Sequence, residues 1–321
     1  MKLGAQPITL RQLQYVVAVA EARNFRKAAQ LCHVSQPSLS AQLAQLEEAL
    51  GVRLFERGRS GVLPTSAGTE LIERARKLVL DADDLIESAR RLGDPFTGTI
   101  RIGVIPTISP YLLPHAAPAL RARYPRLTVA WTEEKTDTLV RLLGAGDIDA
   151  ALLALEADIG EVESEVIAID PFVLATPHGH PLAARREPAA VRELRDACVL
   201  LLDDGHCFRE QALEVCSAAR TEEVAFRATS LSTLAQMVAS GAGITLLPEL
   251  AVDTEQRRAS IDVRPLVAPE PHRTVALVWR PRSSLASALR EIAGTIRDAY
   301  PGGAAVARPD PRARKPPRPR A

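Results

Sequence analysis

Apolar positions recur at helical spacing in the first fifty residues of the chain, and three short segments there predict helices. Residues 9–23 carry an apolar side chain every three or four positions, and residues 25–32 continue the pattern after a short break. Residues 35–51 predict the third helix, because Ser35 can cap its start and Gly51 can end it. Short helices joined by a tight turn are typical of a helix-turn-helix, so we expect that motif here.

Two further segments complete this amino-terminal pattern. Residues 53–68 combine glycines, a proline and three arginines, which predicts a two-stranded wing. Residues 66–92 then repeat apolar positions at a helical period within a polar sequence, so we expect one long helix. Such a helix needs a partner to bury its apolar stripe, and a second copy of the chain would supply one. The stretch GDPFTG, residues 93–98, is expected to act as a hinge.

The pattern changes at residue 99, where β-rich runs begin to alternate with helical ones. Runs such as TIRIGVI, RLTVAW, CVLLL and TVALVW have the composition of strands. The predicted fold class is α/β: an N-terminal winged helix-turn-helix, a long linker helix and a two-lobed effector domain like that of periplasmic binding proteins. The lobes would be joined by a crossover near residue 170 and a return near residue 272. The expected boundaries are 1–65 for the DNA-binding domain, 66–92 for the linker helix, 93–300 for the effector domain and 301–321 for a basic, Pro/Arg-rich, disordered tail.

Composition and charge narrow the possible partners. Of the 321 residues 46% are apolar, which suffices for substantial cores, and the net charge is only +1. That charge is uneven, because residues 1–66 carry +4, residues 301–321 carry +5 and the rest carries −8. A basic amino-terminal block favours nucleic acid as a partner, although a chance scatter of surface charge explains the count equally well. The tail would contact DNA phosphates only nonspecifically, and a dispensable solvated tail is the simpler interpretation.

Nothing in the sequence predicts export or insertion into a membrane. The first residues lack a long apolar run, and no stretch approaches the roughly 18 apolar residues of a spanning helix. We therefore expect a cytoplasmic protein whose thiols stay reduced. The four cysteines form neither a disulfide framework nor a C-x2-C zinc pattern, so no metal or cofactor is predicted. Cys198, in the apolar run ACVLLL, and Cys32, in the helix-turn-helix, are predicted to be inert core residues.

The stretch FRKAAQLCHVSQPSLSAQLAQLEEALGVRLFER, residues 25–57, resembles the winged helix-turn-helix of LysR-type transcriptional regulators. The order of helix-turn-helix, linker helix and two-lobed domain resembles that family over nearly all of residues 8–300. Four stretches resemble its hydrogen-peroxide sensors, namely IPTISPYLLP at 105–114, DDGHCFREQALEVC at 203–216, FRATSLSTLAQMVASGAGITLLP at 226–248 and EPHRT at 270–274. The resemblance implies a dimer or tetramer that binds pseudo-palindromic promoter sites, with RNA polymerase as a further partner.

The third predicted helix has the residues expected of a helix that enters the major groove of DNA. The start of such a helix contacts base edges, and glutamine can pair with adenine through two hydrogen bonds. The candidates are Ser35, Gln36, Pro37, Ser38, Ser40 and Gln42, whereas Gln45 is expected on a solvated face. The resemblance assigns DNA contact to the first three of these residues, although helix capping alone would also explain Ser35. Phosphates would be held by Arg26, Lys27, Arg53, Arg57 and Arg59.

Cys207 and Cys216 stand nine positions apart in a segment that is expected to be helical from 208 to 216. Nine residues of helix correspond to a rise of roughly 13 Å, whereas a disulfide needs Cα atoms about 4.4–6.8 Å apart. The two cysteines therefore cannot bond while the helix persists, which would make the pair a conformational switch. Peroxide would convert the Cys207 thiolate to a sulfenic acid, which would condense with Cys216. The resemblance implies the same roles, with Cys207 peroxidatic and Cys216 resolving.

The resemblance also implies a peroxide pocket. Its residues would be Thr107, Thr136, His206 and Arg273, joined by Glu210 where this family has an aspartate. Threonine hydroxyls can donate to and accept from peroxide oxygens, and the arginine can stabilise a thiolate and the leaving oxygen. Without the resemblance, His206 is equally well explained as a residue at a helix start, and nothing in composition or spacing singles out the two threonines.

These expectations favour a transcription activator of antioxidant genes that consumes peroxide only stoichiometrically and is not an enzyme. One alternative is a LysR-type regulator that binds a small organic ligand in the cleft between its lobes, with the cysteines as bystanders. A thiol peroxidase would need catalytic turnover with a reductant, and it would leave the helix-turn-helix without a purpose. A periplasmic solute-binding protein would share the two-lobed fold, but the DNA-binding block and the missing signal peptide argue against it.

Overall fold

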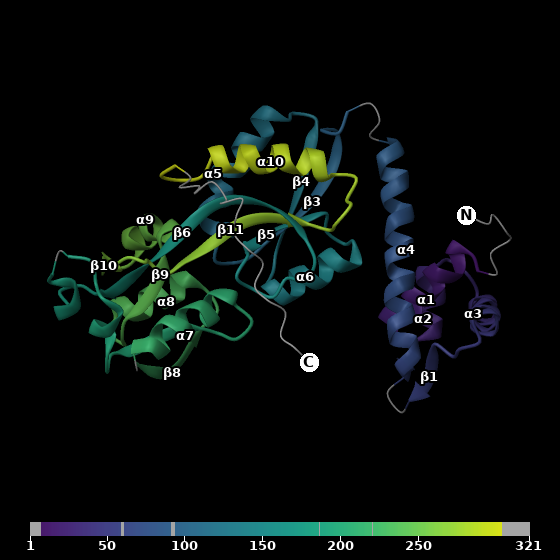
Figure 1. The fold of residues 1–321 in the computed structure, drawn as a ribbon, viewed down its shortest axis with the longest axis horizontal. Coiled ribbons are helices and arrows are strands. Elements are labelled where there is room, and N and C mark those ends of the chain that lie inside the picture. Colours follow the sequence, from purple (N-terminus) through teal and green to yellow (C-terminus); the bar gives the residue numbers. More distant parts are fainter. Residues whose placement is uncertain (1–7, 59–60, 91–93, 186, 220, 304–321) are drawn as a thin grey trace. The chain divides into compact units, whose positions relative to one another are not determined.

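The computed structural model of the chain describes residues 8–58, 61–90, 94–185, 187–219 and 221–303 (Figure 1). Contacts divide the chain into two compact units, Met1–Gly93 and Asp94–Ala321, each with its own hydrophobic core. Some predictions fall outside the described residues, among them the candidate phosphate contact Arg59, the end of the linker helix at 91–92 and the tail from residue 304 onward.

The first unit contains the predicted helix-turn-helix, followed by a two-stranded wing and a long helix. Its elements are α1 (Leu10–Ala22), α2 (Phe25–Leu31), α3 (Gln36–Leu50), β1 (Phe55–Gly58), β2 (Gly61–Pro64) and α4 (Ser66–Arg90). Local sequence explains where the helices begin, because the side chains of Thr9, Asn24 and Ser35 accept hydrogen bonds from the first amides of α1, α2 and α3. Gly51 ends α3 with a φ of 68°, a conformation that glycine adopts at little cost.

The core of this unit determines which face of α3 remains available. Leu39, Leu43 and Leu46 of α3 are buried in one cluster with Leu13 and Val16 of α1. The start of α3 and its face away from this cluster are therefore turned to solvent. The structure thus leaves the helix start free for contact with another molecule.

Helix α4 is covered by its own unit on only one side. It packs along α1, and Ile72 and Ala75 are buried there. Leu78, Leu85 and Ile86, further along α4, are 50%, 71% and 50% exposed. Exposed apolar residues on a long helix are typical of a face that meets a partner.

The second unit alternates strands and helices, as the sequence predicted. The elements of its first half are β3 (Gly98–Val104), α5 (Ser109–Arg123), β4 (Leu127–Glu133), α6 (Thr136–Ala145), β5 (Ala150–Ala154), β6 (Glu163–Pro177) and the short helices η1 (Pro181–Ala183) and η2 (Val191–Leu194). The second half adds β7 (Cys198–Leu202), α7 (Cys207–Ala219), β8 (Glu222–Ala228), α8 (Leu231–Ala239), β9 (Thr245–Pro248), α9 (Glu249–Arg258), β10 (Ile261–Pro265), β11 (His272–Trp279) and α10 (Ala286–Asp298).

Two lobes share the long strands β6 and β11. The main sheet has the order β10-β6-β11-β5-β3-β4, and β9 also pairs with β6. The first half of β6 pairs with β11, whereas its second half, from Phe172 onward, pairs with β9 and β10. The strand therefore changes partners close to residue 170, where the sequence predicted the crossover, and β11 begins at the predicted return, His272.

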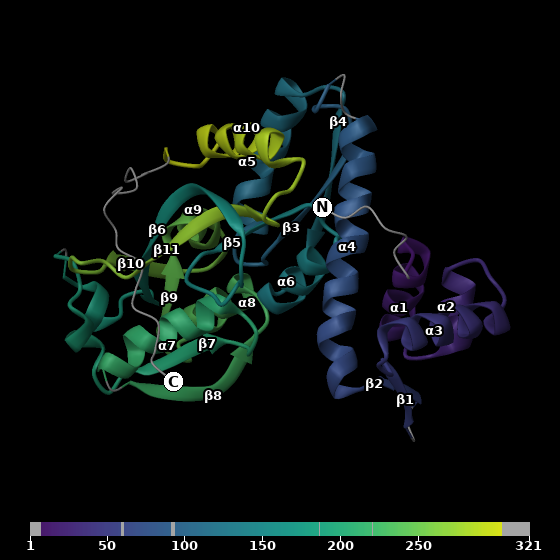
Figure 2. The ribbon, with the colours of Figure 1, turned by 45° about the vertical axis from the view of Figure 1, so that its right-hand side comes forward.

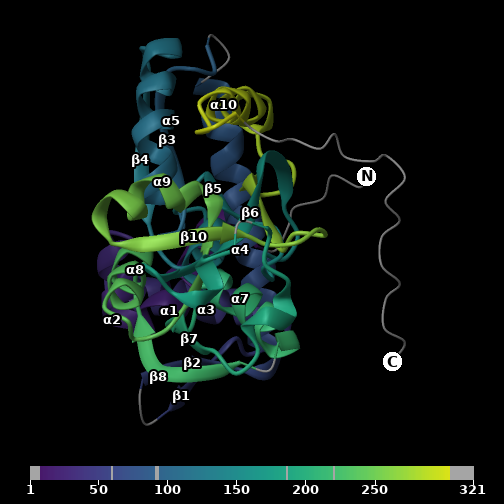
Figure 3. The same cartoon turned by 90° about the vertical axis from the view of Figure 1, so that its left-hand side faces the viewer.

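The views from other sides separate the two ends of this unit. Helices α5 and α10 lie together at one end, and α7 lies with the parallel pair β7–β8 at the other (Figures 2 and 3). Within the described ranges, no helix is long and apolar enough to cross a membrane. The loops that follow β3, β4 and β7 lead into α5, α6 and α7, and these loops carry Thr107 and His206, while Thr136 and Cys207 begin α6 and α7.

Candidate functional site

Helix α7 contains both cysteines of the predicted pair and begins at Cys207 itself. Both thiols are free, and both side chains are buried. The helical rise between Cys207 and Cys216 is roughly 13 Å, which is about twice the largest Cα separation that a disulfide tolerates. The structure is therefore the dithiol form, and a bond between the two sulfurs requires α7 to lose part of its helix.

A small recess surrounds the Cys207 thiol. As the side chains stand it has no room for a water-sized molecule, and it is lined by Ile105, Pro106, Thr107, Lys135, Thr136, His206 and Cys207. Thr107 follows β3, and Thr136 and Cys207 are the first residues of α6 and α7. Two helix amino termini therefore meet at this point, and their partial positive charges favour an anion such as a thiolate.

Arg273 reaches this recess through Thr107. Its fully buried guanidinium donates hydrogen bonds from Nη1 to Thr107 Oγ1 at 2.8 Å and from Nη2 to the Thr107 carbonyl at 3.1 Å. The charge of Arg273 is balanced by Asp170, whose Oδ2 lies 2.8 Å from Nη2. Asp170 also accepts a hydrogen bond from the amide of Leu250 in the first turn of α9. The fold therefore fixes Arg273 in place from two strands and a helix.

Two polar atoms that line the recess have no hydrogen-bond partner among the described residues. They are Thr136 Oγ1 and His206 Nε2, and both are buried. Leaving such a group unpaired costs about 1–3 kcal/mol, so native proteins rarely do so without a functional reason. A small polar ligand placed between them could accept from one and donate to the other.

The electrostatics of the two thiols differ in kind. Burial raises the pKa of the Cys207 thiol above its usual range, while the Thr136 hydroxyl and the Arg273 charge act in the opposite direction. The hydroxyl is a close polar neighbour of the sulfur and does not complete a well-aligned hydrogen bond to it. Burial raises the pKa of Cys216 to about 11, with only the Thr221 hydroxyl opposing that effect. Only Cys207 has a cation and a helix-start hydroxyl that favour its thiolate.

His206 is held in its neutral form. Burial lowers its pKa first, and the nearby Lys135 ammonium lowers it further, while Asp203 acts weakly in the other direction. A neutral imidazole accepts a proton at its bare ring nitrogen and donates a hydrogen bond from the other nitrogen. The ring can therefore exchange a proton with a ligand in the recess at neutral pH.

Two predictions about this region are wrong. Glu210 does not line the recess and is exposed, because the inward stripe of α7 runs through Phe208, Ala212 and Cys216 and places Glu210 on the opposite face. Cys198 is exposed and is not a core residue, since it is the first residue of β7 and only the rest of that strand is buried. Cys32 is partly buried and packs against the core of the first unit.

Sequence reasoning missed two residues of this site. Asp170 is separated from Arg273 by 103 positions, and no motif of the sequence connects them. Lys135 precedes Thr136 at the start of α6 and lines the recess, but a lone lysine at a helix start carries no sequence signal. Arg209, two positions after the thiol in the chain, donates to the Leu202 carbonyl and to Glu223.

The candidate DNA contacts lie at the exposed start of α3. Ser35 caps the helix, with its hydroxyl 3.3 Å from the Ser38 amide, and Ser35 to Ser38 are all exposed. Ser40 and Gln42 are half-buried, and Gln42 accepts from Gln12 and donates to Gln45. Arg26, Lys27 and Arg53 are exposed, whereas for Arg57 only the backbone of β1 is described.

A larger groove lies on the second unit, outside the recess. Its volume is about 420 Å³, and it is lined by Glu156, Phe172, Val191, Gln211, Glu214, Val215, Glu270, Pro271 and His272. Neither cysteine of the pair lines it. The groove has the size of an organic-ligand site, whereas the recess at Cys207 would have to widen even to admit a molecule of the size of water.

Comparison with known proteins identifies both units. Residues 10–69 match the family of bacterial regulatory helix-turn-helix proteins of the lysR type, and residues 93–301 match the LysR substrate binding domain. The chain is 44% identical over 292 residues to the DNA-binding transcriptional dual regulator OxyR of Escherichia coli, covering 90% of this chain and 95% of that protein.

The chain belongs to the LysR family. Among solved structures, this LysR-family chain is similar to a full-length cysteine variant of OxyR from Pseudomonas aeruginosa, with a TM-score of 0.73, 37% identity, and coverage of 90% of this chain and 95% of that one. It is also similar to a hydrogen-peroxide-bound cysteine variant of OxyR from Corynebacterium glutamicum, with a TM-score of 0.62, 33% identity, and coverage of 91% and 92%. Within the LysR family, the relatives that it resembles are thus OxyR proteins, which are regulators and not enzymes.

Proposed function

We propose that this protein is a DNA-binding transcription regulator that senses hydrogen peroxide by reversible formation of a Cys207–Cys216 disulfide. The observation that carries the proposal is the recess at the start of α7, where a buried thiol meets two unpartnered polar atoms, Thr136 Oγ1 and His206 Nε2. A ligand with two adjacent oxygens, each able to donate and accept, suits this pair of atoms. The narrow recess excludes larger oxidants, and peroxide itself would enter with a small shift of the lining side chains.

The chemistry proceeds in two steps. The Cys207 thiolate attacks one peroxide oxygen, the O–O bond breaks, and the other oxygen leaves as hydroxide, which takes up a proton to become water. Cys207 is then a sulfenic acid. In the second step the Cys216 sulfur attacks the Cys207 sulfur, and the sulfenic hydroxyl leaves as a second water with the proton of the Cys216 thiol. One peroxide therefore gives one disulfide and two waters, and two electrons pass from the thiols to peroxide.

The surrounding groups would lower the barrier to the first step. Thr136 and Thr107 would hold the peroxide oxygens, and the neutral His206 would accept the proton of the Cys207 thiol and pass it to the departing hydroxide. Arg273, fixed by Asp170, would stabilise the negative charge that moves from sulfur to the leaving oxygen. These roles involve each predicted pocket residue except Glu210, which lies outside the recess, and Arg273 would act through Thr107.

Disulfide formation would change the shape of the effector domain. Because α7 cannot remain a full helix when its two cysteines bond, the segment between them must repack against β7, β8 and α8. In this proposal residues 1–65 bind DNA, 66–92 join two copies through α4, and 93–300 sense the oxidant, so that oxidation changes the grip of a dimer or tetramer on its promoter. The start of α3 would contact bases, and RNA polymerase would respond to the altered complex at antioxidant genes.

Two chemical conditions complete this proposal. The protein acts in the cytoplasm, where reductants return the disulfide to thiols after the signal has passed. Arg26, Lys27 and Arg53 would hold DNA phosphates, so binding to DNA would weaken steeply with salt.

The first experiment is a mass map of disulfides in the full-length protein after brief exposure to nearly stoichiometric peroxide. Wild type is expected to show the Cys207–Cys216 linkage, and Cys207→Ser is expected to show none. Cys198→Ser is the matched control, because it removes an exposed thiol and is expected to leave the linkage intact. Free thiols at both positions in exposed wild type would overturn the proposal. DNA footprints of both forms would then show whether oxidation alters the contact.

The groove of about 420 Å³ supports a second candidate, a regulator of the LysR type that binds a small organic ligand. Its carboxylates at Glu214 and Glu270 would favour a cationic ligand. Screening cationic metabolites for an increase in the thermal unfolding temperature of the protein tests this candidate. A stabilising metabolite together with indifference to peroxide would replace the first proposal by the second.

A further inference from the structure

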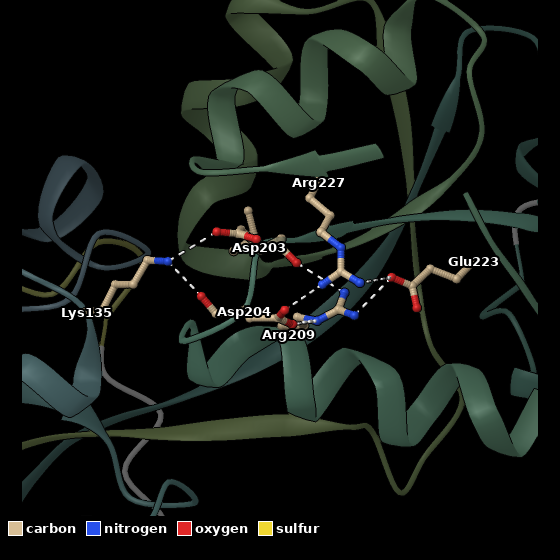
Figure 4. Close-up of polar contacts among 7 residues, drawn as sticks. Lys135, Asp203, Asp204, Arg209, Glu223 and Arg227 are labelled. Atoms are coloured by element: carbon tan, nitrogen blue, oxygen red, sulfur yellow. Dashed lines mark hydrogen bonds and ion pairs between the residues drawn. The ribbon is translucent and has the colours of Figure 1, made fainter. Parts of the chain in front are cut away.

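A cluster of charges beside the recess takes no part in the proposed reaction (Figure 4). Its residues come from four segments, with Lys135 at the start of α6, Asp203 and Asp204 in the loop after β7, Arg209 in the first turn of α7, and Glu223 and Arg227 on β8. These segments lie on both sides of Cys207 in the chain.

Asp204 is the centre of this cluster. Its carbonyl oxygen accepts a hydrogen bond from Lys135 Nζ at 2.6 Å, and its carboxylate pairs with Arg209 Nε at 2.9 Å and Arg227 Nη1 at 2.8 Å. Glu223 Oε1 ties the two arginines together, at 2.9 Å from Arg209 Nη2 and 4.0 Å from Arg227 Nη2. We refer to the contacts of Asp204 with Lys135, Arg209 and Arg227 as the Asp204 clamp.

The clamp also borders the recess. The stem of Lys135 lies over Gly205, so close that a Cβ atom on this glycine would stand 3.1 Å from Lys135 Cδ. Lys135 is one of the lining residues of the recess, and its ammonium contributes to the lowered pKa of His206. The clamp therefore holds the loop of Asp203 to His206 against α6, directly in front of the reactive thiol.

The two ends of α7 are fastened unequally. Arg209, two positions after Cys207, is 7% exposed. It donates to the Leu202 carbonyl and to the carboxylates of Asp204 and Glu223. At the other end, the described polar contacts of Cys216 are those of Thr221, whose amide and hydroxyl reach the Cys216 carbonyl at 3.4 and 3.3 Å. A disulfide must move at least one of these ends, and moving the first end separates Arg209 from Asp204.

We infer that Asp204 is a positioning residue whose clamp exists in the dithiol form and is broken in the disulfide form. The inference rests on the proposed function, because it concerns the equilibrium of the same cysteine pair. A contact present in only one of two forms shifts their equilibrium by its own free energy. The clamp therefore sets how oxidising the surroundings must be before the Cys207–Cys216 bond is stable.

The test is the thiol–disulfide equilibrium of the full-length protein in glutathione buffers. One glutathione disulfide accepts two electrons and the two thiol protons from the protein, which yields the protein disulfide and two glutathione thiols. The oxidised fraction is measured by alkylating the remaining thiols and determining the mass of the peptide that spans 207–216. Asp204→Asn keeps the side-chain shape but removes both ion pairs, and it is expected to raise the equilibrium constant for the disulfide about fivefold.

Further variants separate the arms of the clamp. Lys135→Met and Arg227→Gln each remove one arm and are expected to raise the same constant about twofold. Asp137→Asn is the matched control, because it removes an exposed carboxylate in the first turn of α6 that pairs with none of the described residues, and its constant is expected to equal that of wild type. Raising the ionic strength from about 0.1 to about 1 M should shift wild type toward the disulfide and leave Asp204→Asn nearly unchanged.

Thermal unfolding distinguishes positioning from a general structural role. Asp204→Asn is expected to lower the unfolding temperature of the reduced protein and to leave that of the oxidised protein unchanged. Equal losses in both forms, or an unshifted equilibrium in Asp204→Asn, would overturn the inference and would show that the Cys216 end of α7 is the end that moves. A wild type that forms the disulfide in these buffers keeps the proposed function standing in either case, whereas one that never forms it overturns both.

Discussion

The two ends of α7 present the same side chain, cysteine, in opposite surroundings. At the Cys207 end, two helix starts, a buried arginine and two unpartnered polar atoms surround the sulfur. At the Cys216 end, the sulfur lies among apolar neighbours, and burial alone dominates its pKa. The difference teaches that the chemistry of a thiol is set by what the fold places beside it. In the proposed function, the Cys207 end reacts with the oxidant and the Cys216 end reacts only afterwards.

The largest expected effect comes from removing Arg273 at the reactive end. Arg273→Ala leaves the Asp170 carboxylate buried without its partner, which should cost about 3–5 kcal/mol of unfolding free energy. Urea unfolding of the reduced protein measures this loss. Arg290→Ala is the control, because Arg290 pairs with Glu163 at the surface and should cost at most about 1 kcal/mol. Similar losses for the two variants would mean that the buried pair does not hold the recess together.

The next effect concerns the stability of the protein at high pH and arises from Cys216. Burial raises the pKa of Cys216 from 9.0 to about 11, so the folded protein favours the neutral thiol. The resulting stabilisation is complete below pH 9 and is lost as pH rises through 11, which amounts to as much as about 3 kcal/mol. Urea midpoints of the reduced protein between pH 8 and 11 should therefore fall more steeply for wild type than for Cys216→Ser. Parallel curves would contradict this assignment.

A smaller effect tests whether the Thr136 hydroxyl serves the reaction. Thr136→Val keeps the shape of the side chain and removes a hydroxyl that lowers the pKa of Cys207. Oxidation by peroxide should slow about tenfold, while the stability of the reduced form should stay level or rise, because an unpaired buried group is gone. Stopped-flow rates and urea midpoints measure the two quantities. Thr221→Val, at the other end of α7, should leave the first oxidation step unchanged.

The smallest effect is expected at Glu210. Its exposed carboxylate lies on the solvent face of α7, so Glu210→Gln should change the oxidation rate less than about twofold and the stability by less than about 0.5 kcal/mol. The same stopped-flow and urea measurements apply. A tenfold slower reaction would mean that Glu210 acts close to the Cys207 thiol and would contradict its placement in the structure.

Much of the fold could be predicted because its signals are local. Ser35 and Gly51 mark the ends of α3 within a few residues of chain, and the change at residue 99 reflects a change in apolar period. The placement of Cys207 and Cys216 in one helix followed from the same kind of signal. Caps and periods act through neighbouring residues, so they are readable in a single sequence.

The surroundings of the cysteines could not be predicted in the same way. Arg273 meets Thr107 across 166 positions of chain and Asp170 across 103, and such contacts arise only when β3, β6 and β11 assemble. The prediction that Cys198 is buried failed for a local reason. An apolar run such as ACVLLL does not show which of its residues stands at the exposed beginning of the strand. The two threonines of the pocket were predicted from the resemblance to known regulators. No spacing of residues in the chain indicated them.

The separation of the two cysteines along α7 has a consequence for how the yield of disulfide depends on peroxide concentration. In the proposed reaction, a sulfenic acid at Cys207 would wait until α7 opens, and that opening would proceed at a rate that does not depend on peroxide. Attack by a second peroxide, which converts a sulfenic acid to an irreversible sulfinic acid, becomes faster in proportion to peroxide concentration. Above the concentration at which the two rates are equal, more oxidant would yield less disulfide. The helix would thus give the proposed sensor an upper limit of response.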